Sequence, residues 1–419
     1  MLRSLSPLRH RMFAILWTGA FVSNIGTWME TLSVGILVTN ATGEAIWTGL
    51  VAAAGFVPSA VLGPVGGALA DRVPRRRLLL ITTSIQTVLA GSLALLAAAG
   101  KPSPGVVTLI VLAAGCTQAI GFPAYQAVLP DLVPHDEIVG AVALSSAQWN
   151  LGRVIGPALA GIVISIGGYS WAFGINTLSF FAVIFAVTQL RIPPPVERRA
   201  QSVFSSVREG LAYTRRDPGL RVVVAYMAVN SLLAAPFIGL VAYMAEKVLD
   251  GGAGATAVLV TAQGLGAVLM ALSLAALAAR YGPKRVLLAV LWGLPPALVV
   301  YALMPVLALS AVAIFVVGFL YLGALSSFTS IAQLRAPAAV RGRVMSVLQV
   351  LLGSLYPIGA IAQGAIADVI GLRETTAIAA LLMLALLIGA RVAWPRFAEA
   401  IDAPVAELHG EASGSVEAP

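Results

Sequence analysis

The chain has 419 residues, of which 59% are hydrophobic and 11% are charged, and its formal net charge is +8. A soluble globular protein carries roughly 25% charged residues, so this composition excludes the soluble classes and indicates a protein that crosses a membrane many times. Each crossing is expected to be a helix, because a helix satisfies its own backbone hydrogen bonds in lipid. The apolar runs do not alternate as the strands of a membrane barrel do.

Twelve apolar runs are long enough to span a bilayer, since one span needs about 20 residues. The first run follows a short basic N-terminus and is too long for the apolar region of a signal peptide, so we expect it to be retained. An even number of spans places both ends of the chain on the same side. The predicted spans are about 12–38, 46–70, 78–99, 104–127, 140–166, 170–190, 221–245, 254–279, 285–304, 307–332, 344–367 and 374–394.

The distribution of Lys and Arg predicts the orientation. The termini and the loops on their side carry 22 of these residues, the loops on the other side carry three, and Arg153 lies within a span. Short loops that are rich in Lys and Arg stay in the cytoplasm. We therefore expect a multi-pass protein of the cell inner membrane with both termini in the cytoplasm. The basic residues then reflect topology, and no nucleic-acid partner is expected.

A long polar connection between spans six and seven divides the chain into two sets of six. It begins with Pro193–Pro195, and its later part, 203–216, has apolar residues at helical spacing with cations between them. This pattern predicts a short amphipathic helix at the membrane interface. We expect an N-terminal six-helix bundle (1–190), a cytoplasmic linker (191–220), a C-terminal six-helix bundle (221–395) and a disordered tail (396–419).

Two charged residues lie well inside predicted spans of the first half. Glu30 is in span one beside Trp28, and Arg153 is near the middle of span five. A charge at mid-membrane costs at least about 2.5 kcal/mol, so each needs a partner or a water-filled cavity. One interpretation is structural: an ion pair, or an Arg bonded to helix carbonyls. The other is that Glu30 takes up and releases a proton and that Arg153 controls this step or coordinates an anionic substrate.

Span five contains closely spaced small residues after Arg153. Gly152, Gly156 and Gly161 would allow another helix to approach closely, and Pro157 would bend the helix because it removes a backbone hydrogen bond. Ordinary glycine-rich packing is the alternative to a moving part.

Neutral polar and aromatic side chains recur inside the spans, which fits a largely apolar cavity with a few hydrogen-bonding groups. For any single residue, plain packing is the alternative. The candidates for the substrate cavity are Asn24, Trp28, Gln118, Phe122, Trp149, Asn150, Asn230, Phe237, Gln263, Tyr321, Gln349 and Tyr356.

The histidines argue against a membrane enzyme. His10, His135 and His409 all lie outside the predicted spans, so no intramembrane His is available for a nucleophile pair or a metal site. We expect no enzymatic activity, no metal and no cofactor.

Two stretches resemble the major facilitator superfamily of transporters. Gly67-Ala-Leu-Ala-Asp71-Arg72-x-x-Arg75-Arg76 is similar to its signature loop between spans two and three, with a degenerate copy at 276–285. Gly152 to Gly161 is similar to the span-five antiporter motif of its drug–proton branch. Finer similarity, in 26–30, 208–213 and 341–346, is to the enterobactin-exporter-like and macrolide-efflux-like group.

The resemblance implies an all-α fold of twelve transmembrane helices in two six-helix bundles with pseudo-twofold symmetry. It also implies a central cavity that opens alternately to either side. Asp71 would brace the outward-facing state against the cytoplasmic end of span eleven, with Arg72, Arg75 and Arg76 completing the charge network. The position that matches Asp71 in the second half is Ala279, so one of two symmetric latches is missing.

The function expected from the resemblance is a monomeric secondary transporter that exports amphipathic small molecules, drug-like or siderophore-like, in exchange for protons. A proton-independent facilitator or importer is the alternative within transport. A receptor or a membrane enzyme is a more remote one.

Overall fold

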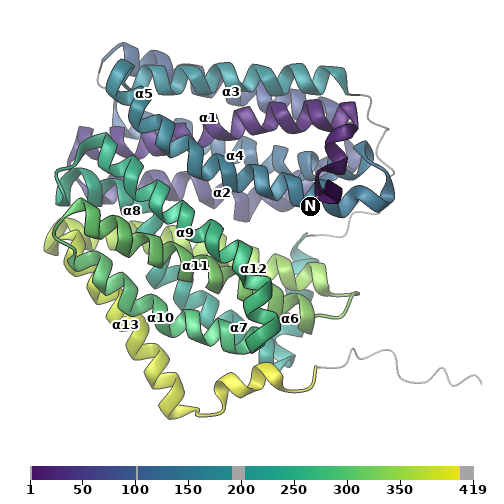
Figure 1. Cartoon of the computed structure of the whole chain (residues 1–419), viewed down its shortest axis with the longest axis vertical. Helices are drawn as coiled ribbons and strands as arrows, with labels where there is room; N and C mark the ends of the chain where they lie inside the picture. The colour runs from purple at the N-terminus through teal and green to yellow at the C-terminus, as the bar shows by residue number, and fades with distance from the viewer. Residues whose placement is uncertain (1, 101, 191–202, 406–419) are drawn as a thin grey trace, which may run out of the picture.

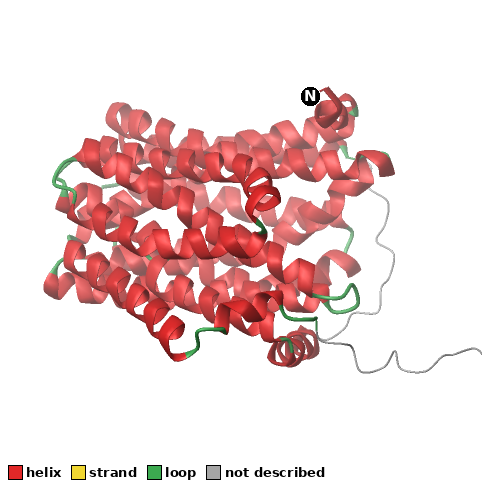
Figure 2. Cartoon of the chain, turned by 60° about the horizontal axis from the view of Figure 1, so that its bottom comes forward, coloured by secondary structure: helices red, strands yellow, loops and turns green. Residues whose placement is uncertain are grey.

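The computed structural model describes residues 2–100, 102–190 and 203–405, and within these residues the chain is helical with no β-strand (Figures 1 and 2). Pro193–Pro195 and the part of the predicted disordered tail beyond residue 405 lie outside the described residues. The long helices are α1 (Arg11–Thr42), α2 (Ala45–Arg72), α3 (Arg75–Ala98), α4 (Pro104–Val128), α5 (Ile138–Gln189), α9 (Gly252–Tyr281), α10 (Pro283–Leu303), α11 (Leu307–Arg335), α12 (Arg341–Ile370) and α13 (Leu372–Ala393).

Three shorter helices join the two sets of long ones. α6 (Val203–Arg216) precedes α7 (Pro218–Val229), and a π-helical segment, Asn230–Ala234, leads toward α8 (Phe237–Tyr243). A second π-helical segment, Met244–Val248, follows α8, so that Pro218–Val248 forms one candidate membrane span. Short 3₁₀ helices occupy Leu2–Arg9, Leu129–Leu132, His135–Glu137 and Phe397–Asp402.

Eleven helices in the described residues are long and apolar enough to cross a membrane, compared with the twelve predicted spans. The difference arises in one element, His135–Gln189, which is 55 residues long. Within it Gly168 has φ 70° and ψ −171°, a conformation that interrupts the helix and that glycine adopts without strain. The two arms of α5 on either side of Gly168 are each long enough to span, so this one kinked helix accounts for two of the predicted spans.

The apolar core is divided between the two parts of the chain. The largest cluster of buried hydrophobic residues runs from Tyr213 to Ile401 and takes in only Ala45 from the earlier helices. A second cluster runs from Phe13 to Leu190. In Figure 1, α1–α5 form the upper part of the molecule and α7–α13 the lower part. We call these parts the N-terminal half and the C-terminal half. The exact boundaries of two six-helix bundles stay a prediction.

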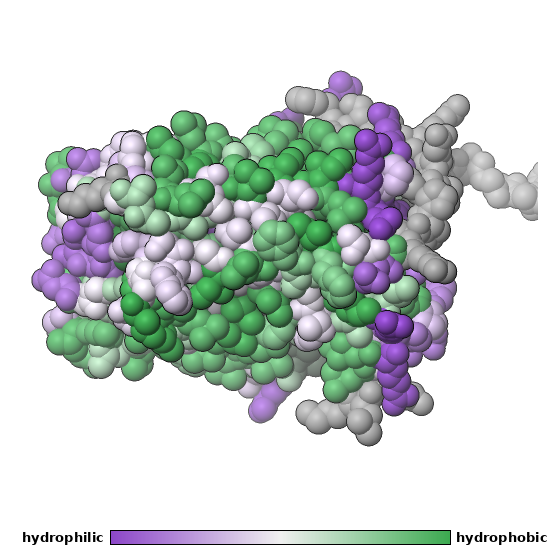
Figure 3. Space-filling view, turned by 90° about the horizontal axis from the view of Figure 1, so that it is seen from above, coloured by the Kyte–Doolittle hydropathy of each residue, from purple (hydrophilic) through white to green (hydrophobic). Residues whose placement is uncertain are grey.

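The molecular surface has an apolar middle and two polar ends, as a protein of the bilayer requires. Figure 3 shows hydrophobic residues over most of the length and hydrophilic residues gathered toward both ends. We call the end where α2 meets α3, which carries Arg72 and Arg75–Arg77, the basic end, and the end where α1 meets α2 the opposite end. That the basic end faces the cytoplasm stays a prediction.

The helix α6 lies against the start of α12 at the basic end. Arg343 Nη1 is 2.6 Å from Glu209 Oε2, and Gly210 leaves no room for a Cβ beside the backbone of Arg343. Tyr213 and Thr214 are buried. The amphipathic segment therefore packs its later residues on the C-terminal half.

Candidate functional site

The two halves are joined by hydrogen bonds at the opposite end. Asn40 Nδ2 on α1 donates to Glu246 Oε2 at 2.9 Å, and the Tyr243 hydroxyl donates to the Gly43 carbonyl at 3.4 Å. Asp368 on α12 accepts from the backbone N–H of Ala45 at 2.5 Å. Together these contacts close the opposite end in this conformation.

The helices α2 and α12 touch along the half of their length nearest the opposite end and separate beyond it. Gly364 packs on the backbone of Ala45, and Gly353 packs on Ala60. Farther toward the basic end, a Cβ added at Gly63 or Gly67 of α2 would meet nothing within 4 Å among the described residues. The structure is therefore closed at the opposite end and opens toward the basic end.

The Glu30 carboxylate is held by an amide of the same half. Asn176 Nδ2, on the second arm of α5, donates to Glu30 Oε2 at 2.7 Å, and the Ser179 hydroxyl donates to Asn176 Oδ1 at 3.1 Å. Asn176 is fully buried, and Gly26 one turn before Glu30 lets the two helices approach. A carboxyl group is thus placed inside the membrane-spanning part with a fixed amide donor.

Arg153 does not form an ion pair with Glu30 in the described residues. Its guanidinium carbon lies 5.7 Å from the ring centroid of Trp28, an arrangement that favours a cation over the ring face. A Cβ added at Gly264 of α9, in the C-terminal half, would lie 3.6 Å from the Arg153 carbonyl oxygen. Arg153 therefore stands between the two halves, next to the helix that carries Glu30.

The small residues of the first arm of α5 face two different helices. A Cβ at Gly156 would lie 2.6 Å from Trp28 Cβ and 2.7 Å from the Ile25 carbonyl oxygen, so this glycine permits contact with α1. Gly152 also faces α1. A Cβ at Gly161 would lie 2.7 Å from Ala257 Cβ on α9, in the other half. Pro157 is buried between these contacts.

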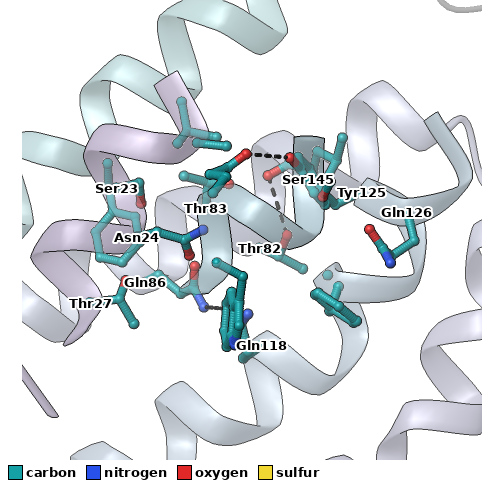
Figure 4. A pocket seen from close by; sticks show the side chains of 18 of the residues that line it. Ser23, Asn24, Thr27, Thr82, Thr83, Gln86, Gln118, Tyr125, Gln126 and Ser145 are labelled. Carbon is teal, nitrogen blue, oxygen red and sulfur yellow. Dashed lines mark hydrogen bonds between the residues drawn. The ribbon is translucent and has the colours of Figure 1, made fainter. Parts of the chain in front are cut away.

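A cavity of about 300 Å³ lies within the N-terminal half, between α1, α3, α4 and both arms of α5 (Figure 4). Five of the predicted substrate-cavity residues line it: Asn24, Gln118, Phe122, Trp149 and Asn150. Trp28 does not line it, but its ring packs against Trp149 with centroids 5.7 Å apart. Gln86 also lines it and donates to Gln118 at 2.6 Å.

The predicted cavity residues of the C-terminal half lie elsewhere. Phe237 packs edge-on against Tyr321, with ring centroids 5.5 Å apart, and Tyr356 packs against Phe56 of α2. Asn230, Phe237, Gln263, Tyr321 and Tyr356 are buried, whereas Gln349 is exposed. In this conformation the C-terminal candidates do not join the N-terminal cavity.

Some residues of the signature loop are bound within the N-terminal half, and others make no polar contact in the described part of the chain. Arg75 Nη1 lies 2.5 Å from Asp131 Oδ2, and Arg76 donates to the carbonyls of Val187 and Thr188, so both are bound within the N-terminal half. Asp71 makes no hydrogen bond or ion pair within the part of the chain that the structure describes, and the same holds for Arg72. These two residues are available at the basic end.

Three residues of the site were not among those predicted. Asn176 and Gln86 are single polar residues in apolar runs. This feature is the signal by which the sequence could have identified them as candidates for the site. Asp368 is an acid near the end of a span, a position that also suits a solvated side chain. In each case the partner lies far away in the sequence.

The family model described as transmembrane secretion effector matches residues 2–415. The multidrug efflux pump Tap of Mycolicibacterium fortuitum is 28% identical over 396 residues, covering 91% of this chain and 94% of Tap. The enterobactin exporter EntS of Citrobacter koseri is 27% identical over 333 residues, covering 75% and 72%. The nucleoside transporter NupG has a similar fold, with a TM-score of 0.72 at 15% identity, covering 94% of this chain and all of NupG.

Proposed function

The chain belongs to the transmembrane secretion effector family of the major facilitator superfamily, and we propose that it exports amphipathic small molecules, drug-like or siderophore-like, in exchange for protons. The names of Tap and EntS, an efflux pump and an exporter, support the direction of transport. The transporter moves its substrate by alternating access between the two halves. The basic end faces the cytoplasm, and the conformation described above accepts substrate from that side.

The observation that carries proton exchange is the hydrogen bond from Asn176 to Glu30. A carboxyl group inside a membrane is costly, so its presence within the membrane-spanning part marks a functional group. The donor stabilises the charged form, while the apolar surroundings favour the neutral form. The two forms are therefore balanced by local contacts, and a movement of α1 against α5 shifts that balance.

Arg153 couples this balance to the arrangement of the halves. Its backbone borders Gly264 of α9 across the junction, and its charged group lies over Trp28 on α1. When the halves move, the position of this cation relative to Glu30 changes, and so does the preference of Glu30 for a proton. Protonation and the direction of opening are then linked.

The test compares efflux by the wild type and by Glu30→Gln in proteoliposomes with and without an imposed proton gradient. We expect gradient-driven efflux by the wild type and none by the variant, with exchange of substrate down its own gradient retained. Glu399→Gln is the matched control, since Glu399 is exposed at the basic end. Full dependence on the gradient in Glu30→Gln would remove Glu30 from the mechanism. Wild-type flux that does not depend on the proton gradient would identify the protein as a facilitator instead.

A further inference from the structure

The cavity of the N-terminal half is lined by many neutral hydrogen-bonding groups. Of its 21 lining residues, eight carry a hydroxyl and six carry a carboxamide, and none is charged. Ligand sites are usually mostly apolar with a small number of polar groups, so this lining is unusually polar. Several of these groups bond within the protein, as Thr82, Thr117 and Asn150 do to backbone carbonyls of their own helices, and the others can bond to a ligand.

Two of the carboxamides make no hydrogen bond to the described part of the protein. Gln86 pairs with Gln118, and the Tyr125 hydroxyl donates to Gln148 Oε1 at 3.2 Å. By contrast, Asn24 on α1 and Gln126 on α4 have no such partner, and Figure 4 shows both amides directed toward the cavity. Each offers an N–H₂ donor and a carbonyl acceptor side by side, a pair that matches a hydroxyl group, which both donates and accepts.

Aromatic faces complete one wall of the cavity. The rings of Phe122 and Trp149 lie 6.2 Å apart and are tilted by 58°, and both side chains are more than a third exposed. Aromatic faces flanked by amides suit a ligand that has apolar C–H faces and hydroxyl edges.

The charges around the cavity argue against an ionic ligand. A charged group placed there would lose its water without gaining an opposite charge, which is costly. The nearest acid, Glu30, is held by Asn176 and does not line the cavity, so it offers a cation no direct contact. Arg153 itself does not line the cavity, so it offers an anion no direct contact.

We infer that this cavity is a binding site for an uncharged polyhydroxylated group, such as a glycosyl or polyol part of the substrate. This inference adds a substrate class to the proposed export function. It rests on that function only in treating the bound ligand as the transported substrate. A cavity of about 300 Å³ is at the lower limit for ligand pockets, so it accepts one such group and leaves the rest of an amphipathic molecule in the junction between the halves.

The test uses three probes with the same eight-carbon tail: octyl β-D-glucoside, octyltrimethylammonium and octanoate. The protein is purified in a polyoxyethylene detergent, which has no sugar head, and transferred to lipid nanodiscs. Equilibrium dialysis then measures binding of each radiolabelled probe, corrected for empty nanodiscs. We expect the glucoside to bind at least about tenfold more tightly than either ion, because an uncompensated ion in this cavity is strongly penalised.

Variants locate the binding site. Asn24→Leu and Gln126→Leu should each weaken glucoside binding about five- to tenfold, the effect of one lost hydrogen bond. Because neither amide bonds to the described protein, both variants should keep the wild-type unfolding temperature. Gln333→Leu, an exposed residue of α11 outside the cavity, is the control and should bind as the wild type does.

Equal or tighter binding of either ion would overturn the inference, and so would glucoside binding that neither variant changes. This outcome is distinct from failure of the proposed export function. Binding in nanodiscs needs no gradient and no transport, whereas the efflux assay in proteoliposomes needs no glucoside. Gradient-driven efflux without glucoside preference would leave the export function standing and refute the inference about the ligand.

Discussion

The Asp368 carboxylate on α12 accepts a hydrogen bond from the backbone N–H of Ala45, at the first residue of α2. Its second oxygen accepts from the N–H of Ile46 at 3.0 Å. An acid at a helix N-terminus satisfies free N–H groups and interacts favourably with the helix dipole. Asp368 thus caps the N-terminus of α2 from the other half of the same chain, and this contact ties the two halves together at the opposite end.

Asp368→Asn should weaken closure of the opposite end. The variant removes the charge and places an N–H₂ group against a backbone donor, which costs about 1 kcal/mol or about a fivefold change in the conformational equilibrium. In a Cys116→Ala background, we expect about fivefold faster thiol labelling of Ala257→Cys, which lies buried across from Gly161. Asp250→Asn, an exposed acid at the same end, is the control. Unchanged labelling would mean that the cap does not hold the halves together.

Asp71→Asn should act in the opposite direction. The helix α2 ends at the basic end and α12 begins there, so closing that end would bring Asp71 toward the N-terminus of α12, as the family resemblance implies. Removing the charge then destabilises the state that is closed at the basic end. We expect slower labelling of Ala257→Cys and unchanged substrate affinity within one conformation.

The control for Asp71→Asn is Asp136→Asn, since Asp136 is an exposed acid toward the basic end. Faster labelling in Asp71→Asn would contradict the proposed brace. If Asp71→Asn and Asp368→Asn are combined, the two effects should largely cancel, because α2 and α12 carry the two acids at opposite ends of one helix pair.

The membrane helices could be predicted closely from hydropathy, because lipid requires each span to be apolar and helical. The predicted span 46–70 corresponds to α2 (Ala45–Arg72), and 254–279 corresponds to α9 (Gly252–Tyr281). The break between the fifth and sixth predicted spans falls at Gly168, where a glycine pair follows an apolar run. Local sequence therefore carries most of the information about the helices.

The contacts of the site could not be predicted in the same way. Glu30 is identifiable as a charge in an apolar run, but its donor, Asn176, is 146 positions away and differs little from other neutral polar residues of the spans. Asp368 is bonded to a backbone 323 positions earlier. Such partners depend on how the helices pack, and a single sequence contains no direct record of that packing.

A buried ion pair secures the C-terminal half at the basic end. Asp217 accepts from Arg335 Nε and Nη2, each at 2.7 Å, and also from the backbone N–H of Leu220, while Arg335 Nη1 donates to the Ile401 carbonyl. Asp217→Ala leaves a buried guanidinium without its counter-charge, so the free energy of unfolding should fall by about 3–5 kcal/mol. Thermal unfolding in detergent measures the effect.

The pair between Lys284 and Asp402 provides the comparison for Asp217→Ala. These side chains are 2.5 Å apart, but that of Asp402 is 65% exposed. Asp402→Ala should therefore change the free energy of unfolding by less than about 1 kcal/mol. Equal effects of the two substitutions would show that burial does not determine the strength of the Asp217 pair.

Gly156→Ala tests the contact between the first arm of α5 and α1. The added Cβ would lie 2.6 Å from Trp28 Cβ and 2.7 Å from the Ile25 carbonyl oxygen, so one helix must shift. Overpacking of this kind costs about 1–3 kcal/mol, and here it also displaces the helix that carries Glu30. We expect a lower unfolding temperature and a loss of gradient-driven efflux. Gly174→Ala is the matched control, since its Cβ meets nothing within 4 Å and its side chain should improve the helix slightly. Equal stability and efflux in the two variants would show that the α5–α1 contact tolerates a methyl group and is not part of the transport mechanism.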